Sequence, residues 1–512
     1  MHPPQQLIWH LPDGISIADV MTGLEENFSL EQSPAVTSER TYYDTFDWRL
    51  YKQSLLMMKE GQYWHLVDMD DEEKATYLAD IKKDCRFWWD FPSSSMRDIL
   101  GNIISVRALL PVASLSISTQ PIRVVNKDEK TVGYVDLLEQ NNGKGTNLFR
   151  SVRLREVRGY GKRFTKLTEF FNQYGEAKNI SGGNELRATL KAEGGRSPLD
   201  YTSKFGVPLN AGMSARQAVK TIYRDLLATM LRNRQGILDD LDSEFLHDFR
   251  VAVRRTRSAM SLIKNVLEPE VVEHFQEEFR YLGQVTGATR DLDVYLLMED
   301  NYKARLPESL QTGLHYFFED LAQRRREEQK RLARALRESR YQQIVVDWQD
   351  YLDRDDQENP TSKSNMPVER IARKIIMKRC LRVVRDGRAI HQDTPDSELH
   401  RLRIQGKKLR YSLEFFSSLF PEKKIKKLIK QLKLLQDNLG DFNDLSVQQD
   451  MLHEYLDNIK PRTVKAKGLA AAIGGLLTNL YHQHRRVRTH FEETFAHFVS
   501  KENLAVYQEL FG

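Results

Sequence analysis

Hydrophobic and polar positions follow two different patterns along this 512-residue chain. Before residue 190, apolar residues form short runs that partly alternate with polar ones and are separated by turn signals such as Glu60-Gly61. This pattern predicts β-strands. The predicted strands are Leu55–Met58, Tyr63–Met69, Ile103–Leu110 and Thr131–Leu138. A helix is predicted over Gly161–Tyr174, so this part is expected to be mixed α and β.

After Ala211, apolar residues recur at three- and four-residue spacing among many Arg, Lys, Glu and Gln. That spacing predicts a bundle of amphipathic helices. The most apolar run, Leu469–Leu480, is shorter than the roughly 20 residues that span a bilayer, so we interpret it as a buried helix. The polar stretch 354–366 predicts a loop, and Pro367 suits the first turn of the next helix.

The stretch between these parts contains several Gly and two Pro residues and has little periodicity, which predicts a domain boundary within Gly194–Pro208. We therefore expect an α+β domain over 1–193, a linker over 194–208 and a helical domain over 209–512. The helical domain is expected to consist of repeat halves at about 209–355 and 366–512.

An internal repeat at an offset of 153 residues lies in the helical part. The first copy is LHDFRVAVRRTRSAM (Leu246–Met260) and the second is LHRLRIQGKKLRYSL (Leu399–Leu413). The paired positions are His247 with His400, Arg250 with Arg403, Arg254 with Lys407, Arg255 with Lys408, Arg257 with Arg410, Arg232 with Arg385, and Asp291 with Asp444. The match has no gap and keeps charge position by position, which indicates a true repeat.

Each copy predicts a basic ladder beside an apolar helix face. At 100° per residue the first ladder lies within roughly 80° of arc, with one lysine extending it. It comprises His247, Arg250, Arg254, Arg257 and Lys264. The apolar sets are Phe249, Val253, Met260 and Ile263 in the first copy and Leu402, Leu409, Leu413 and Phe416 in the second. Arg255 and Lys408 lie off the ladders.

A dense run of lysines follows the second copy: Lys423, Lys424, Lys426, Lys427, Lys430 and Lys433, against one Glu. Like charges this close destabilise a helix by about 0.2–0.5 kcal/mol per pair. That cost is easier to understand if an anion normally neutralises the lysines.

Charge and cysteine usage narrow the function classes. Net charge is −3 over residues 1–200 and +8 over 201–512, so the basic surplus belongs to the helical part. Cys85 and Cys380 have no CxxC partner, so neither a zinc site nor a disulfide framework is expected, which fits a reducing cytoplasm. No secretory leader is expected at the N-terminus. We expect no metal, no cofactor and no membrane partner.

Plainer interpretations of these residues stand beside a role in anion binding. The ladders could be solvated basic faces, although two matching copies favour binding. His247 and His400 could be capping or core residues, and His247-Asp248 also spells the HD pair of metal-dependent phosphohydrolases, which the second copy lacks. Asp291 and Asp444 are expected to cap a helix or to hold an arginine in position.

The motif His-x-x-Arg-x-x-x-Arg-Arg-x-Arg, present twice and followed by an Asp, resembles the CHAD domain over roughly Leu209–Gly512, with Lys407 and Lys408 in place of arginines. The resemblance implies two antiparallel four-helix bundles related by pseudo-twofold symmetry. It also implies a basic cleft that binds inorganic polyphosphate, and association with polyphosphate granules in bacteria. The expected binding residues are His247, Arg250, Arg254, Arg255, Arg257, Lys264, His400, Arg403, Lys407, Lys408, Arg410, Lys423, Lys426, Lys427, Lys430 and Lys433, supported by Arg232, Arg385, Asp291 and Asp444.

CHAD domains often follow a CYTH domain, a triphosphate tunnel in an α+β β-barrel. Thr41–Leu66, Arg107–Val112 and Arg153–Phe164 resemble a divergent CYTH domain. Active CYTH enzymes open with a Glu-x-Glu-x-Lys strand whose carboxylates hold a divalent metal. Gln5–Gly14, in that place, has neither Glu nor Lys. Without such carboxylates, phosphoanhydride hydrolysis has no evident electrophile. The N-terminal domain is therefore expected to be catalytically silent, with no catalytic residues.

The sequence thus predicts a cytoplasmic binding protein for inorganic polyphosphate, with granule proteins as further candidate partners. A scaffold role at granules, in which the N-terminal domain binds another protein, is compatible with this prediction. Two alternatives of other classes stay open. One is a metal-dependent triphosphatase or phosphohydrolase acting through the CYTH-like domain. The other is a nucleic-acid-binding protein, which is disfavoured because base recognition wants aromatics among the basic residues. The ladders offer only Phe249, on an apolar side, and Tyr411, at an edge.

Overall fold

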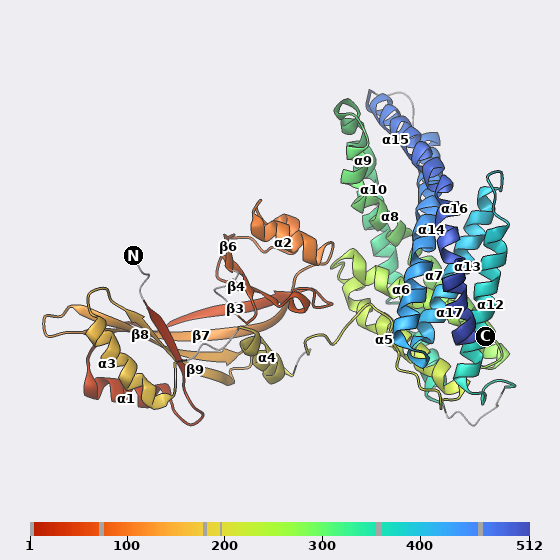
Figure 1. Cartoon of the computed structure of the whole chain (residues 1–512). Helices are drawn as coiled ribbons and strands as arrows, with labels where there is room; N and C mark the ends of the chain where they lie inside the picture. The colour runs from red at the N-terminus through yellow and green to blue at the C-terminus, as the bar shows by residue number, and fades with distance from the viewer. Residues whose placement is uncertain (1–4, 71–75, 178–181, 195–196, 355–360, 459–463) are drawn as a thin grey trace. The chain divides into compact units, whose positions relative to one another are not determined.

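The computed structural model describes residues 5–70, 76–177, 182–194, 197–354, 361–458 and 464–512 (Figure 1). The chain divides into two compact units, Met1–Thr202 and Ser203–Gly512, and this division lies inside the 194–208 segment. We describe each unit by itself. Unit 1 is an antiparallel sheet with flanking helices, and unit 2 is helical, as the sequence predicted.

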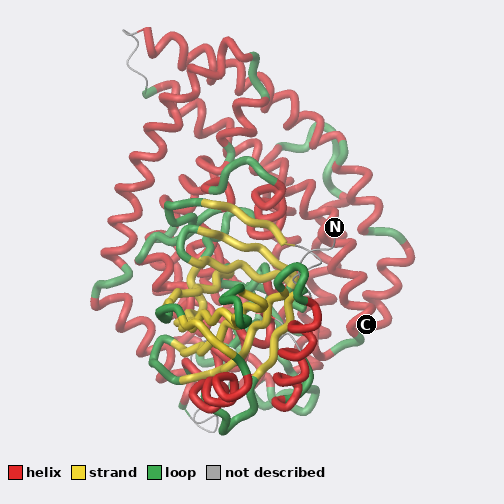
Figure 2. The backbone as a smooth tube through the Cα atoms, turned by 90° about the vertical axis from the view of Figure 1, so that its left-hand side faces the viewer, coloured by secondary structure: helices red, strands yellow, loops and turns green. Residues whose placement is uncertain are grey.

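In the described residues of unit 1, nine strands form one antiparallel sheet in the order β1-β9-β8-β7-β3-β4-β5-β6, with β2 paired to β7. Figure 2 shows the strands together as a curved sheet. The strands are β1 (Gln6–His10), β2 (Ser29–Gln32), β3 (Val36–Asp44), β4 (Leu55–Glu60), β5 (Tyr63–Asp68), β6 (Thr76–Asp80), β7 (Leu110–Val125), β8 (Thr131–Asn142) and β9 (Asn147–Glu156).

Helices cover the sheet of unit 1. They are α1 (Ile17–Asn27), α2 (Ser95–Ile104), α3 (Gly161–Phe171) and α4 (Gly182–Glu193), with short 3₁₀ turns at Tyr51–Gln53, Trp88–Asp90 and Asn172–Tyr174. Strand residues point alternately to the two faces. On β8, Leu137 packs in the core that contains Leu167 of α3, and Leu138 packs in the core that contains Leu186 of α4.

Three of the four predicted strand segments are confirmed. Leu55–Met58, Tyr63–Met69 and Thr131–Leu138 begin at the same residues as β4, β5 and β8. The prediction for Ile103–Leu110 is wrong. Ile104 is the last residue of α2, whose buried positions repeat at a four-residue spacing, and Ser105 then turns the chain with a left-handed φ of 53°. Ile103 and Ile104, at the start of the predicted strand, are therefore the last residues of a helix.

Unit 2 is built from a succession of helices. They are α5 (Ala215–Leu238), α6 (Ser243–Leu262), α7 (Pro269–Val285), α8 (Gly287–Leu297), α9 (Glu299–Ala304), α10 (Glu308–Ala335), α11 (Ser339–Asp353), α12 (Val368–Arg388), α13 (Asp396–Phe415), α14 (Glu422–Asp457), α15 (Val464–Thr489), α16 (Phe491–Phe498) and α17 (Lys501–Phe511), with a 3₁₀ turn at Ser417–Leu419.

The 153-residue repeat reappears in the helix boundaries. The helices α5, α6 and α7 begin 153 residues before α12, α13 and α14, and α6 and α13 also end 153 residues apart. The halves differ after that point, because α14 is one continuous helix of 36 residues where the first half has α7, α8 and α9. The repeat therefore preserves the helices that carry the motif, whereas the helical segments that follow them differ between the halves.

Two reciprocal backbone hydrogen bonds mark the pseudo-twofold relation between the halves. Ala215 N donates to Met366 O over 2.8 Å, and Val368 N donates to Met213 O over 3.1 Å. Met213 and Met366 are equivalent positions in the repeat, as are Ala215 and Val368. Such exchange of equivalent partners is what a twofold axis between the pairs produces.

The remaining predictions for unit 2 concern a loop and a buried helix. Leu469–Leu480 lies within α15 and contributes buried residues to the core shared with α10. Pro367 is the N-cap of α12, one position before the first turn predicted for it. Of the predicted 354–366 loop, residues 354 and 361–366 are outside helices, and 355–360 lie outside the described residues. A search of the described helices found none with the length and apolar character of a bilayer span.

The lack of a side chain at Gly313 allows α10 and α15 to approach closely. A Cβ built on Gly313 would lie 2.3 Å from the carbonyl oxygen of Gly468 and 3.0 Å from the Cβ of Ala472. Both distances are shorter than ordinary van der Waals contact between heavy atoms. A side chain at position 313 would therefore push the two helices apart.

We expect Gly313→Ala to lower the unfolding midpoint of unit 2, because overpacking costs about 1–3 kcal/mol. Thermal unfolding of the full chain followed by circular dichroism measures this. Gly474→Ala is the matched control, because a Cβ there meets nothing within 4 Å. The control should be neutral or stabilising by up to about 1 kcal/mol through helix propensity. Equal effects of the two substitutions would contradict the close approach.

Candidate functional site

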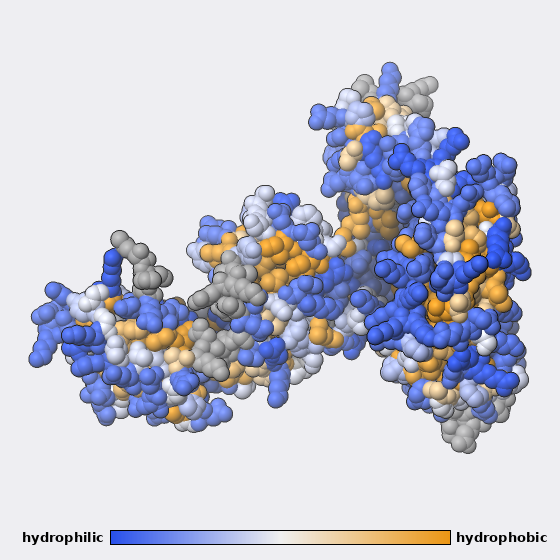
Figure 3. Space-filling view, in the orientation of Figure 1, coloured by the Kyte–Doolittle hydropathy of each residue, from blue (hydrophilic) through white to orange (hydrophobic). Residues whose placement is uncertain are grey.

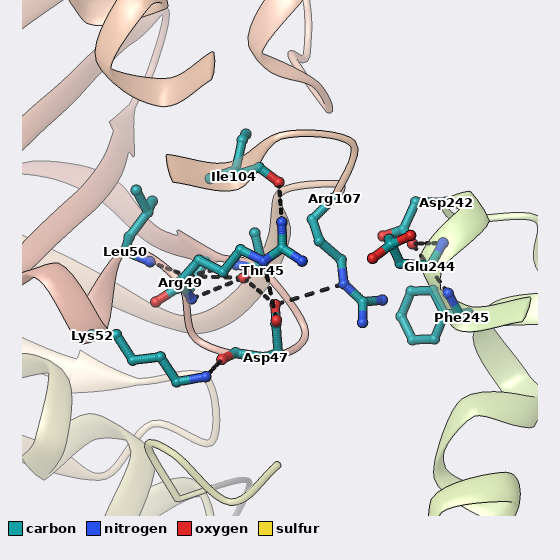
Figure 4. A network of polar contacts seen from close by, with 11 residues as sticks. Thr45, Asp47, Arg49, Leu50, Lys52, Ile104, Arg107, Asp242, Glu244 and Phe245 are labelled. Carbon is teal, nitrogen blue, oxygen red and sulfur yellow. Dashed lines mark hydrogen bonds and ion pairs between the residues drawn. The ribbon is translucent and has the colours of Figure 1, made fainter. Parts of the chain in front are cut away.

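The two motif copies lie on α6 and α13, and each helix has a clear start. Asp242 caps α6, since its carboxylate accepts hydrogen bonds from the backbone of Glu244 and Phe245 over 2.9 and 3.3 Å (Figure 4). Pro395 is the N-cap residue of α13, and Asp396 lies in its first turn, where negative charge suits the helix dipole.

Both helices bury the apolar faces that the sequence predicted. The buried residues of these faces are Phe249, Val253, Met260, Ile263, Leu402, Leu409, Leu413 and Phe416. Complete burial of a side chain of this kind contributes about 1.5–3 kcal/mol. This packing fixes the rotation of each helix and therefore the direction in which its basic ladder points.

The two motif histidines are held through the same ring atom by residues 43 positions later. Nδ1 of His247 lies 2.9 Å from Nη2 of Arg290, and Nδ1 of His400 lies 2.5 Å from Oδ1 of Asn443. A guanidinium can only donate, so Nδ1 of His247 accepts, whereas Nδ1 of His400 donates to the amide oxygen. The two histidines therefore occupy equivalent positions, but Nδ1 accepts a hydrogen bond in the first half and donates one in the second.

The arginines three residues after the histidines are also positioned, but differently. Arg403 donates to Asp444 over 3.0 Å, as predicted for an aspartate that holds an arginine. Arg250 donates instead to Gly283 O and Thr286 Oγ1, over 2.9 and 2.8 Å. The break after α7 explains the difference, because the last carbonyls of a helix lack intrahelical donors.

Asp291 is the equivalent of Asp444 and acts on Arg250 through its charge. Burial raises the pKa of Asp291, and the charges of Arg250 and Arg290 oppose that rise. Of the two roles expected of these aspartates, contact with an arginine is present as a hydrogen bond in the second half and only as proximity of charge in the first.

A cavity of about 390 Å³ lies between α6, α13 and α14. The predicted binding residues that line it are His247, Arg254, Arg255, Arg403, Lys407 and Arg410. Residues of the two motif copies, 153 positions apart, therefore meet at one cavity. From the sequence, a cleft shared by the two copies is implied only by the family resemblance and its symmetry.

The cations of the cavity crowd one another. Burial, followed by the charges of Arg403 and Arg254, lowers the pKa of Lys407 to about 8. Burial and Arg254 likewise lower the pKa of Arg403, although Asp444 opposes this. Within the described part of the chain, neither Arg254 nor Lys407 has a carboxylate at ion-pair distance. This part of the cavity therefore holds positive charge that no ion pair among the described residues neutralises.

Sequence reasoning missed the carboxylates of the cavity. Its described lining also includes Glu244, Asp248, Glu414 and Asp437. Glu414 accepts from Arg410 Nε over 2.6 Å and from Arg255 Nη2 over 2.8 Å. Glu414 follows Arg410 by one helical turn, so its spacing could have predicted the first of these contacts. The second joins residues 159 positions apart and needed the fold.

Several predicted binding residues lie outside this cavity. Arg257 lines a neighbouring hollow of about 270 Å³ together with Arg254. Lys264 and Lys408 belong to another group, in which burial and then Arg379, Arg382 and Lys264 lower the pKa of Lys408. Among the supporting residues, Arg385 pairs with Asp386, and Arg232 acts on Asp225 through its charge.

The lysine run lies on the surface of α14. Lys423, Lys426, Lys427, Lys430 and Lys433 are exposed, and Lys424 is partly buried. Lys426 pairs with Glu422 over 2.5 Å, and Lys424 pairs with Glu509. Pairs this exposed stabilise a protein little. Figure 3 shows hydrophilic side chains over much of the visible surface of unit 2, which is consistent with these placements.

Unit 1 has its own polar network around the Asp44–Lys52 turn. Asp47 accepts from Thr45 Oγ1 over 2.9 Å and from Arg49 Nε over 3.0 Å, and Lys52 donates to its backbone oxygen (Figure 4). The carboxylate of Asp44 accepts backbone hydrogen bonds from Leu50 and other residues of the turn. Burial nevertheless raises the pKa of Asp44 to about 6. These contacts hold the turn together.

Arginines of the sheet in unit 1 pair with carboxylates. Glu185 of α4 accepts from Arg40 over 2.6 Å and from Tyr42 and Gln140. The other arginine–carboxylate pairs include Arg40 with Glu60, Arg123 with Glu31, Arg150 with Glu139 and Arg155 with Asp136. Across the described residues of the whole chain, no group of three or more His, Cys, Asp or Glu is arranged to hold a metal ion.

Comparisons with known proteins identify the helical unit. Residues 221–453 match the family model of the CHAD domain, so unit 2 carries a CHAD domain. A crystal structure of the CHAD domain from the plant Ricinus communis is 24% identical, covers 57% of this chain and 95% of its own, and has a TM-score of 0.47. A search among curated proteins found no match.

Two further structures resemble the antiparallel sheet unit and are CYTH-like. One, from Bacillus halodurans, is described as a candidate adenylate cyclase; it is 12% identical and covers 35% of this chain and 91% of its own, with a TM-score of 0.21. The other, from Hippeastrum, is described as an adenylyl cyclase homologue with a dominant triphosphatase activity. It is 13% identical and covers 39% of this chain and all of its own, with a TM-score of 0.25.

Burial and crowding of the cavity cations predict that removal of one cation stabilises the fold. The pKa of Lys407 is lower in the fold than its ordinary value of 10.5, so its charge costs stability below about pH 8. That cost fades as pH rises towards 10.5, because the unfolded chain then binds more protons than the folded one. We expect Lys407→Met to stabilise unit 2 at pH 7 by about 1 kcal/mol once solvent screening is allowed for.

Thermal unfolding at pH 7 and at pH 10 measures this effect. The gain should shrink at the higher pH, where the parent lysine is largely neutral. Lys330→Met on the exposed side of α10 is the control and should shift the midpoint little at either pH. A loss of stability at pH 7 in Lys407→Met would show that the lysine is not under electrostatic strain.

Proposed function

We propose that this chain, which carries a CHAD domain at residues 221–453, binds inorganic polyphosphate in the cavity between α6, α13 and α14. The observation that supports this most directly is the meeting of both motif copies there, with no carboxylate of the described residues at ion-pair distance from Arg254 or Lys407. A phosphate chain would supply the missing negative charge. Guanidinium groups bind phosphate oxygens through paired donors, and a lysine adds a point charge.

The cavity suits a linear polyanion better than a nucleic acid. Besides the imidazole of His247, its described lining contains one aromatic side chain, Tyr411, which is only 8% exposed. Binding of single-stranded nucleic acid relies on bases stacking on accessible aromatic rings. Recognition through phosphate alone needs no such surface. The proposed partner is therefore inorganic polyphosphate, and in a cell that stores it the chain would associate with the granules and their proteins in the cytoplasm.

We propose no catalytic role for unit 1. A triphosphatase would need carboxylates that converge on a divalent metal, whereas the β1 segment offers none. The sheet arginines described above, such as Arg40 and Arg123, are already paired with carboxylates. A phosphate ligand would have to displace those partners. Metal-dependent triphosphate hydrolysis is therefore the weaker alternative for this chain.

Removal of the cavity charges should abolish tight binding. We expect the triple substitution Arg254→Gln, Arg403→Gln and Lys407→Gln to weaken binding of labelled long-chain polyphosphate by at least about 100-fold, since each charge-assisted contact contributes about 1.5–3 kcal/mol. The matched control removes three exposed cations of α10, Arg326, Lys330 and Arg334, and should stay within about threefold of the parent.

The same titration should be repeated at two salt concentrations and in competition with RNA of equal phosphate concentration. Binding should weaken steeply with salt, as it does for other polyanions. The proposal fails if RNA competes as well as polyphosphate, or if the cavity variant binds like the parent while it remains folded.

Binding should also depend on pH through Lys407. Its pKa is about 8 without ligand, and an adjacent phosphate should raise it towards the ordinary value, because an opposite charge favours the protonated form. Binding then takes up a proton, so affinity falls as pH rises from 7 to 9, at most tenfold per pH unit. Lys407→Arg should flatten this dependence, since arginine stays protonated. A parent and variant with the same pH profile would exclude Lys407 as the titrating group.

A further inference from the structure

A stripe of lysines on α14 continues the wall of the cavity. Lys423, Lys426, Lys430 and Lys433 alternate at three- and four-residue spacing, and the same spacing leads on to Asp437 and Gly440, which line the cavity. Residues with this spacing share one helix face. We call these four residues the lysine stripe. It runs about 15 Å along the helix, at 1.5 Å per residue, and its last member lies one helical turn before Asp437, which lines the cavity.

The pairing of α13 with α14 places the end of the stripe beside a cavity residue. His400 contacts Asn443, and a Cβ on Gly406 would lie 3.7 Å from Gln436 Cγ. Continuing this antiparallel register sets Arg410 beside the turn of α14 that contains Lys433. Lys430 and Lys433 have no carboxylate at ion-pair distance in the described part of the chain. The half of the stripe nearest the cavity is therefore available to an anion that extends out of it, whereas Lys426 pairs with Glu422.

The equivalent face of the first half carries the opposite charge. The repeat offset of 153 residues matches the lysine stripe with Glu270, Glu273, Glu277 and Arg280 on α7. All four are exposed, and Arg280 pairs with Glu277 over 2.8 Å. We call Glu270, Glu273 and Glu277 the glutamate stripe. A fold with pseudo-twofold symmetry thus presents a basic face on one side of its axis and an acidic face at the equivalent place on the other.

We infer that a long polyphosphate chain leaves the cavity on one side only, along the lysine stripe of α14, and is repelled from the glutamate stripe of α7. This inference rests on the proposed function and adds a preference for chain length. A short polyphosphate fills the cavity and contacts neither stripe. A long one gains the lysines as well, through contacts that act within a screening length of about 8 Å at physiological salt.

The test compares tripolyphosphate with long-chain polyphosphate on the full chain and three variants. The first variant replaces the four lysines of the stripe with Gln. The second replaces the three glutamates of the other stripe with Gln. The third is a matched control that replaces four exposed cations of α10, Arg326, Lys330, Arg331 and Arg334, with Gln. Affinities are measured over a range of salt, and folding is checked by thermal unfolding.

We expect the lysine variant to bind the long chain at least about tenfold more weakly, with a salt dependence that falls by about one unit per lysine that contacts phosphate. Its affinity for tripolyphosphate should stay within about twofold of the parent. The glutamate variant should bind the long chain more tightly, and the α10 control should match the parent for both ligands.

The inference is overturned if the lysine variant and the α10 control lose affinity equally, or if the lysine variant loses tripolyphosphate as much as it loses the long chain. Weaker binding of the long chain by the glutamate variant would likewise overturn the one-sided path. A parent that binds neither ligand would instead defeat the proposed function itself, so the two failures can be told apart.

Discussion

The structure of the candidate site depends on apolar packing that holds like charges together. Arg254 on α6 and Arg403 and Lys407 on α13 repel one another, and after burial this repulsion is the next cause of the lowered pKa of Lys407. What opposes the repulsion is burial of the apolar face on each helix, represented by Phe249 and Leu402. Several side chains at about 1.5–3 kcal/mol each outweigh the repulsion between partly solvated cations. Binding sites commonly give up stability in this way, and an anion would return it.

Pseudo-twofold symmetry creates the cavity, and departures from that symmetry make its two sides chemically different. The motif histidines keep the same geometry, yet His247 accepts from Arg290 while His400 donates to Asn443. A positively charged partner in one half is replaced by a neutral amide in the other. The largest departure is on α7 and α14, where glutamates replace lysines at equivalent positions. The repeat therefore sets where side chains stand, and substitutions within it decide what charge they present.

The sequence predicted those features of the fold and of the candidate site that depend on local periodicity. The repeat and the three- and four-residue spacing identified the faces of α6 and α13, because a helix presents residues by sequence separation alone. It could not predict that Glu414 joins Arg255 to Arg410, since one of these contacts spans 159 residues. Nor could it show that Arg250 bonds to Gly283 O, which depends on where α7 ends. Local pattern also misled once, when the helix ending at Ile104 was read as a strand.

Arginine alone does not mark a phosphate site, and the two units show why. In unit 1, Arg40 already bonds to the nearly buried carboxylate of Glu185. A phosphate that displaced Glu185 would leave its charge buried and unpaired, at a cost of about 3–5 kcal/mol. In unit 2, Arg254 and Lys407 have no such partner among the described residues, so a phosphate would remove repulsion without stranding a carboxylate. The balance between cations and the carboxylates within their reach, more than the number of cations, is therefore what would direct an anion to the helical unit.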